Sequence, residues 1–220
     1  MVMKMNSVFL QAFILTVIFF FGGIFLGMSI ENNRIEEIND YYLDSEIRMM
    51  DILSFNNLIE TVNVSCEELT DSNFKLVDKV YFEAKKIEEY LDSNKMNDGI
   101  ENFNKKYSVL RTYLWIDSIK VKEKCENSFN TLVYLYDAST KDLTKMAKQN
   151  VFSKILEEIK TDTGRNVLLI PIDVSSDLNS LNALVSKYNP EKREFPIIIL
   201  NEEKVFYQVE DSDEIFSQLK

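Results

Sequence analysis

The sequence predicts a chain of three parts: an N-terminal transmembrane helix, an all-α stalk with a small bundle, and a C-terminal α/β domain. An uncharged apolar run lies near the N-terminus, and helical periodicity without proline fills the next stretch. After position 125 the pattern changes to short apolar runs that alternate with amphipathic helices. We therefore place the three parts at residues 7–30, 31–125 and 126–220.

The composition excludes several classes of function. The 220 residues carry 36 acidic and 25 basic side chains, a net charge of -11, two cysteines and no histidine. Zinc sites, haem ligand sets, Ser-His-Asp triads and Cys-His dyads therefore lack essential parts. An acidic chain is also a poor binder of the phosphate backbone. We expect no metal, no cofactor and no nucleic-acid partner.

The first part is an apolar run between Lys4 and Glu31 that contains no charged residue. Val8 to Met28 matches the roughly 20 residues that a helix needs to cross a bilayer. The alternative is a cleaved signal peptide, but its apolar region is usually about 7 to 15 residues long. We favour an uncleaved anchor, which makes the chain a single-pass membrane protein.

The side of the membrane depends on weak signals. One basic residue flanks each end of the apolar run, Lys4 and Arg34, so the positive-inside rule gives almost no preference for either orientation. The short N-terminal tail and the cysteine pair favour an extracytoplasmic soluble part. Gly23 and Gly27 have the GxxxG spacing that lets two helices approach closely, as in a homodimer. In a membrane helix with three glycines, chance spacing is the favoured explanation.

The stalk is an amphipathic helix predicted from Glu31 to about Glu60. Eight acids and two bases in this segment favour a solvated stalk over a helix lying on anionic lipid. Apolar residues occupy the a and d positions of one heptad register, as in a coiled coil, with Ser45 and Asn56 as polar exceptions. These apolar positions are Ile35, Ile38, Tyr42, Met49, Ile52 and Ile59.

Two more helices are predicted at Ser72–Leu91 and Asp98–Lys124, where apolar residues recur every three or four positions. Trp115 lies near the apolar stripe and is interpreted as a core aromatic. Cys66 precedes this pair of helices and Cys125 follows it. A disulfide would close a loop of about 60 residues; buried thiols or a reactive thiol are the alternatives. Neither cysteine belongs to a CxxC motif.

The C-terminal part has the predicted order β-α-β-α-β-β-α. Gly164 is expected to end the first helix, Asp177 to cap the second, and Asp211 or Ser212 to cap the third. Pro171 inside the second strand predicts an edge position or a bulge. The strands are Thr131–Tyr136, Val167–Val174, Pro196–Leu200 and Lys204–Val209, with 201–203 as a hairpin loop, and the helices are Lys141–Thr161, Asp177–Tyr188 and Asp211–Lys220. The first helix offers Met146, Val151, Ile155, Leu156 and Ile159 for its inner face.

This order, with a proline opening the third strand, resembles the thioredoxin fold over Thr131 to Lys220. Local matches are Ile172-Asp173 at the end of the second strand, Lys187-Tyr188-Asn189, and Phe195 to Leu200. The resemblance implies that Pro196 follows a cis bond. It also implies that the backbone of Phe195 lies open beside the first helix, where an extended peptide could pair with it.

The chain departs from redox-active members of that family at the CxxC position. Asp137 to Leu143 occupy this place and contain no thiol. Ser139 and Thr140 would stand at the nucleophile positions, but a hydroxyl without a base is inert. Capping the following helix is their simpler role.

The leading hypothesis is a membrane-tethered, redox-inactive, thioredoxin-like module that binds a protein or peptide. The candidate binding residues are Phe195, Pro196, Ser139 and Thr140, and no catalytic residue is nominated. One alternative is a thiol-disulfide oxidoreductase that uses Cys66 and Cys125. Another is a structural membrane protein that self-associates.

Overall fold

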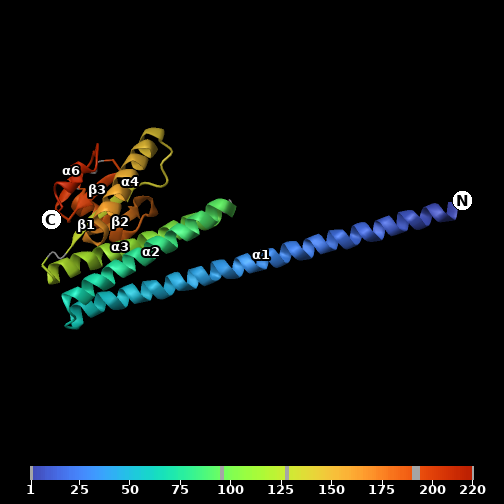
Figure 1. The fold of residues 1–220 in the computed structure, drawn as a ribbon, viewed down its shortest axis with the longest axis horizontal. Coiled ribbons are helices and arrows are strands. Elements are labelled where there is room, and N and C mark those ends of the chain that lie inside the picture. The colour runs from blue at the N-terminus through green and yellow to red at the C-terminus, as the bar shows by residue number, and fades with distance from the viewer. Residues whose placement is uncertain (1, 95–96, 127–128, 190–193, 220) are drawn as a thin grey trace. The chain divides into compact units, whose positions relative to one another are not determined.

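The computed structural model describes residues 2–94, 97–126, 129–189 and 194–219 (Figure 1). Side chains are described for 9–30, 43–44, 46–85 and 104 onward within these ranges. The chain divides into two compact units, Met1–Arg48 and Met49–Lys220.

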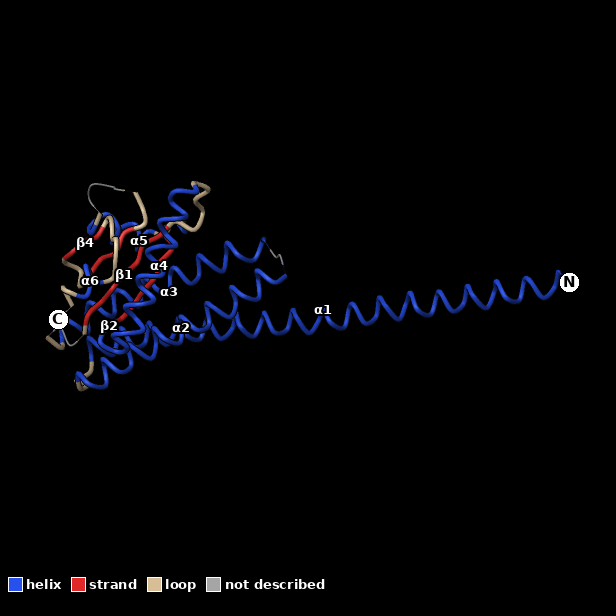
Figure 2. The backbone as a smooth tube through the Cα atoms, turned by 45° about the horizontal axis from the view of Figure 1, so that its top comes forward, coloured by secondary structure: helices blue, strands red, loops and turns tan. Residues whose placement is uncertain are grey.

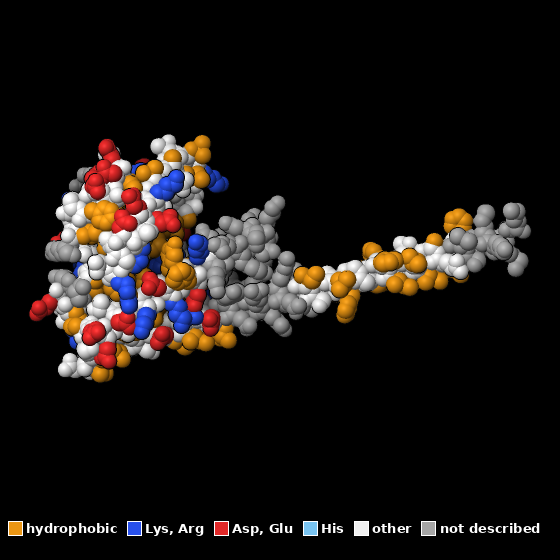
Figure 3. All heavy atoms as spheres, in the orientation of Figure 1, with side chains coloured by type: hydrophobic (Ala, Val, Ile, Leu, Met, Phe, Trp, Pro, Cys, Tyr) orange, Lys and Arg blue, Asp and Glu red, His pale blue; other side chains and the backbone are white. Residues whose placement is uncertain are grey.

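Helix α1 (Val2–Thr61) carries the apolar segment. Phe9–Ile30 is long and apolar enough to cross a membrane, and its side chains are not buried inside the protein. Figure 3 shows hydrophobic side chains along this stretch. A helix that is apolar all round and has no protein neighbour is typical of a membrane span.

Helix α2 (Cys66–Asn94) begins six residues before the predicted start. Ser65 explains the difference, because its hydroxyl accepts a hydrogen bond from the Glu68 amide (3.2 Å) and donates one to the Glu68 carboxylate (3.0 Å). A serine followed three residues later by glutamate is a common helix start. Helix α3 (Asn97–Lys124) then packs along α2.

The last turns of α1 pack inside the second unit. Ile52 and Ile59 are buried in one cluster with side chains of α2 and α3, and Met49 packs against that cluster. These three heptad residues therefore pack against other helices of the same chain. The other heptad residues, Ile35, Ile38 and Tyr42, lie outside the described side chains, so pairing between copies stays a prediction.

The sheet has the strand order β2-β1-β3-β4 (Figure 2). Its strands are β1 (Asn130–Tyr136), β2 (Val167–Asp173), β3 (Ile197–Leu200) and β4 (Lys204–Phe206). β1 runs parallel to β2 and antiparallel to β3, and β3 and β4 are antiparallel. Pro171 lies in the edge strand β2, as predicted.

Helices cover both faces of the sheet. Leu132 and Tyr134 of β1 face α4 (Leu143–Thr163) and α6 (Asp213–Phe216). Val133 and Leu135, on the opposite face, belong to the cluster that contains α2, α3 and α5 (Asn179–Tyr188). This compact unit therefore holds both the helical hairpin and the sheet that the sequence assigns to separate parts. A boundary at 125/126 stays a prediction.

Several element ends differ from the predictions. Asp177 does not cap α5: it lies in the left-handed region (φ 45°), and its carboxylate accepts from Asn182 Nδ2 (3.0 Å). β4 stops at Phe206 because it pairs with only three residues of β3. α6 stops at Phe216, where bonds from Gln218 and Leu219 to carbonyls three residues back tighten the chain. Gly164 ends α4 with φ 55°, as predicted.

Two predicted inner-face residues of α4 are exposed. Ile155, Leu156 and Ile159 are buried together with Phe152, which completes an i, i+3, i+4, i+7 stripe. Met146 and Val151 lie off this stripe and are 43% and 48% exposed.

A buried ion pair joins α3 to the sheet. Lys122 is 5% exposed, and its Nζ donates to Glu202 Oε2 (2.9 Å), Asn201 Oδ1 (2.9 Å) and Thr131 Oγ1 (3.2 Å). Glu202 Oε1 accepts from Trp115 Nε1 (3.2 Å) and Thr131 Oγ1 (2.7 Å). All three donors of the ammonium group therefore have partners on the sheet side.

The ion pair explains the shape of the turn between β3 and β4. Asn201 and Glu202 have φ of 52° and 58°. Asparagine tolerates this left-handed conformation, whereas for glutamate it costs on the order of 1 kcal/mol. The bonds of the Glu202 carboxylate to α3 and β1 offset that cost.

We predict that Lys122→Met destabilises the unit by about 3–5 kcal/mol, because it leaves the Glu202 carboxylate, whose side chain is only 12% exposed, without its counter-charge. Urea denaturation of the full chain in detergent, followed by Trp115 fluorescence, measures the loss. Lys154→Met, at an exposed lysine of α4, is the matched control. The double variant Lys122→Met/Glu202→Leu should recover much of the loss; an equal or larger loss would contradict a dominant role for the ion pair.

Candidate functional site

The loop between β1 and α4, residues 137–142, is ordered by its own side chains. The Asp137 carboxylate accepts from the Ser139 amide (3.0 Å) and hydroxyl (2.7 Å). This arrangement is an Asx turn. Ser139 is exposed, but its hydroxyl is already engaged with Asp137.

Asp142, and not Ser139 or Thr140, caps α4. Its Oδ1 accepts from the Thr144 amide (2.8 Å) and the Lys145 amide (3.4 Å), and Thr140 Oγ1 accepts from the Asp142 amide (3.4 Å). The capping role expected of Ser139 and Thr140 is therefore wrong. Helix α4 begins at Leu143, two residues later than predicted, so the N-cap position falls on Asp142.

Asp173 at the end of β2 holds this loop to the sheet. The side chain is 3% exposed, and its Oδ1 accepts from the amides of Ala138 (3.0 Å) and Ser175 (3.0 Å). Ser108 of α3 donates to the Asp173 carbonyl (3.1 Å). Asp173 thus contacts both the loop 137–142 and α3, at the carboxyl ends of the parallel strands β1 and β2.

The segment before β3 lies beside the first turns of α4. The Phe195–Pro196 bond is cis, as expected; Phe195 is half-buried and Pro196 is buried. Pairing of β3 with β1 begins at Ile197, opposite Leu135, so Phe195 precedes the paired residues. Lys145 of α4 forms an ion pair with Glu194 (3.3 Å), which joins this segment to the helix.

Apolar side chains are exposed where α4 begins. Leu143 is 79% exposed and Met146 is 43% exposed. We call these two side chains of α4, together with Phe195, which is partly buried and packs against the cluster on the other sheet face, the apolar rim. Leu143 was not predicted from the sequence as an exposed site residue, and Met146 was predicted in the core. Both lie outside the stripe of buried residues on α4, and this position is the sequence signal for their exposure.

Burial shifts the pKa values of two titratable groups in and beside α4. Burial raises the pKa of Tyr134 to about 12, and its hydroxyl donates to the Gln149 carbonyl (3.1 Å), so the phenol stays protonated. Burial lowers the pKa of Lys148, and the Glu194 carboxylate opposes this shift. The loop 137–142 contains no thiol.

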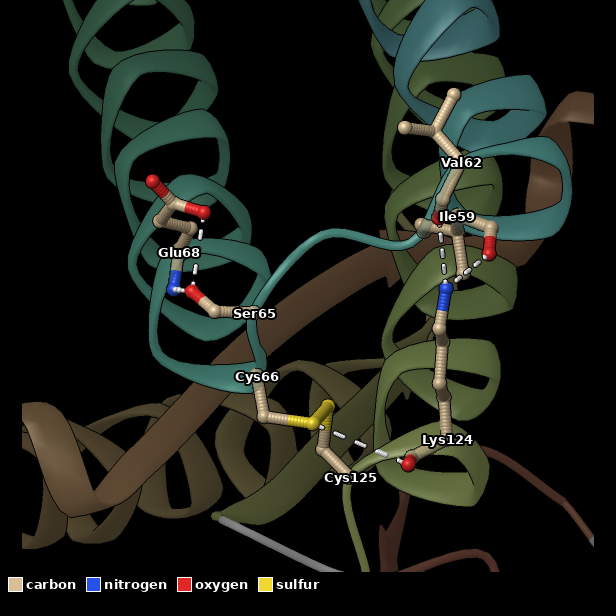
Figure 4. The surroundings of a disulfide bond; sticks show 7 residues. All are labelled: Ile59, Val62, Ser65, Cys66, Glu68, Lys124 and Cys125. Carbon is tan, nitrogen blue, oxygen red and sulfur yellow. Dashed lines mark hydrogen bonds between the residues drawn. A yellow bond between two sulfur atoms is a disulfide. The ribbon is translucent and has the colours of Figure 1, made fainter.

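The cysteines form a disulfide in the helical hairpin (Figure 4). Cys66 at the start of α2 and Cys125 after α3 have Cα atoms 5.5 Å apart. Next to it, Lys124 Nζ donates to the carbonyls of Ile59 (2.8 Å) and Val62 (3.1 Å) at the end of α1. The predicted pairing is confirmed, and the ends of three helices are joined at this place.

Comparison of the chain with protein-family models, with curated proteins and with solved structures gave no match.

We predict that Cys66→Ala/Cys125→Ala lowers the free energy of unfolding by about 4 kcal/mol, because the unfolded chain regains the freedom of a loop of about 60 residues. Urea denaturation under non-oxidising conditions measures the loss. Adding a dithiol to the wild-type chain should reproduce it. A loss below about 1 kcal/mol in both experiments would contradict the prediction.

We also predict that Asp173→Ala speeds hydrogen exchange of the Ala138 and Ser175 amides at least tenfold, because bonds to a charged acceptor contribute about 1.5–3 kcal/mol. Amide exchange of the full chain in detergent measures the change. Asp177→Ala, at an exposed aspartate four residues further along the chain, should leave the Ala138 amide unchanged. Equal exchange in both variants would show that Asp173 does not hold the loop.

Proposed function

We propose that the chain is a membrane-tethered, redox-inactive, thioredoxin-like protein that binds an extended segment of another protein or peptide at its apolar rim. The strand order β2-β1-β3-β4, with β3 and β4 antiparallel and helices on both faces, supports a thioredoxin-like arrangement. The cis bond before β3 agrees with it.

The single observation that carries the binding role is the exposure of Leu143 and Met146 beside the segment that holds Phe195. Clustered exposed apolar side chains on a folded unit often mark contact surfaces. An extended partner could form backbone hydrogen bonds at Phe195, beyond the end of the β3 ladder, while its apolar side chains contact the rim. Affinity and preference for apolar sequences would follow from these two contributions.

Redox chemistry does not fit this role. The loop before α4 has hydroxyl and charged residues in place of thiols, and both cysteines of the chain are joined to each other in the helical hairpin. A disulfide of this kind is typical of proteins that fold in an oxidising compartment. This supports a soluble part outside the cytoplasm, tethered through the apolar segment Phe9–Ile30.

The test uses the full chain in lipid nanodiscs and an array of 12-residue peptides whose sequences are taken from a model protein. We expect the chain to bind apolar peptides. For the peptide that binds most tightly, Leu143→Glu and Phe195→Asp should each raise the Kd measured in solution at least tenfold. Fluorescence anisotropy measures the Kd. Val151→Glu, an exposed apolar residue of the same helix, is the matched control and should leave the Kd unchanged.

Ser139→Ala should also change the Kd little, because the hydroxyl is engaged with Asp137. The proposal fails if no peptide binds, or if the rim variants and Val151→Glu bind equally well. Melting curves of each variant verify that the unit is folded.

A further inference from the structure

A carboxyl group is buried where α1 meets the helical hairpin. Asp117 of α3 is 0% exposed, and its Oδ1 accepts a hydrogen bond from Asn56 Nδ2 of α1. Its Oδ2 is buried and has no hydrogen-bond partner among the described residues. An ionised oxygen without a partner is far more costly in such a place than a protonated one.

A chain of polar contacts connects Asp117 to the end of α1. Lys120 Nζ of α3 donates to Asn56 Oδ1 (2.7 Å) and also pairs with Glu60 of α1. The buried residues Ile52 and Ile59 each lie about one turn from Asn56 along α1. The contact between α1 and α3 therefore combines buried apolar side chains with a carboxyl group of which one oxygen has no partner among the described residues.

The charged groups that act on Asp117 come from two of the three packed helices. Glu60 of α1 raises its pKa, and Lys120 of α3 and the bond from Asn56 lower it. From α2, the uncharged Asn73 pairs with Ser118 (3.3 Å), the neighbour of Asp117. Burial is the largest influence, and the pKa of Asp117 is raised to about 7.

We propose that Asp117 makes the packing of residues 49–61 of α1 on the α2–α3 hairpin dependent on protonation, tight when Asp117 is neutral and weaker when it is ionised. Since α1 also carries the apolar segment Phe9–Ile30, release of residues 49–61 lengthens the tether of the compact unit. This regulation is separate from peptide binding at the apolar rim and does not depend on it.

The sign follows from the proton count. A carboxyl whose pKa is about 7 when packed and 3.8 when exposed keeps a proton only in the packed state between these values. Packing therefore weakens by up to about tenfold per pH unit as the pH rises through this window, and the dependence levels off above about pH 7.

The experiment is amide hydrogen exchange of the full chain in nanodiscs between pH 5 and 8, corrected for intrinsic exchange. We expect the protection of residues 52–59 to fall roughly tenfold between pH 5 and pH 6 and to flatten above pH 7. Asp117→Asn keeps an acceptor for Asn56 and cannot ionise, so its protection should not depend on pH. Glu60→Gln should keep the dependence but move it to lower pH, because Glu60 raises the pKa of Asp117. The β1 amides should show no such dependence.

Two results would overturn the proposal: a pH dependence in Asp117→Asn equal to that of the wild type, or a flat profile in the wild type. A second measurement serves if the Asn variant does not fold. The carbon-13 shift of the Asp117 carboxyl in the wild-type chain should titrate with a midpoint near 7. A midpoint below about 5 removes the basis of the proposal.

Discussion

The buried ion pair between Lys122 and Glu202 is the constraint on which the arrangement of the compact unit depends. A charge removed from water is costly unless its partners are held in place, so α3, β1 and the β3–β4 turn must keep one relative position. The turn accepts a left-handed glutamate for this reason. Trp115, which donates to the same carboxylate and packs against Tyr188 of α5 at a ring distance of 5.3 Å, extends the constraint to a second helix.

The packing around this ion pair covers both faces of the sheet. The hairpin of α2 and α3 shares its core with one sheet face, and α4 and α6 cover the other. Leu143 and Met146 are exposed at the end of the sheet where β1 and β2 stop and α4 begins. Asp173 and Asp142 order the backbone there through its amides, which leaves the apolar side chains of the rim outside the hydrogen-bonded network.

Features encoded by neighbouring residues could be predicted from the sequence. The apolar segment, the strand β1, the edge position of Pro171 and the glycine stop at Gly164 all depend on local pattern or backbone chemistry. The interactions that position the site could not be predicted, because Lys122 and Glu202 are 80 positions apart and Asn56 and Asp117 are 61 apart. Nothing in a helical pattern distinguishes Lys122 from the exposed lysines around it.

Short-range misses have a different cause. Ser65 and Asp142 both carry cap signals that were present in the sequence, but competing candidates stood within a few residues of each. Met146 was placed in the core because hydrophobicity alone does not specify which side of α4 faces the sheet. The stripe of Phe152, Ile155, Leu156 and Ile159 decides that, and only packing shows which stripe is used.

The two outer strands of the sheet affect how copies of this protein can meet. An open edge strand is a template for edge-to-edge pairing with a strand of another copy. Pro171 removes an amide donor from β2, and β4 offers only three residues. Both outer strands are therefore poor templates, and copies crowded on the same surface can meet without fusing their sheets.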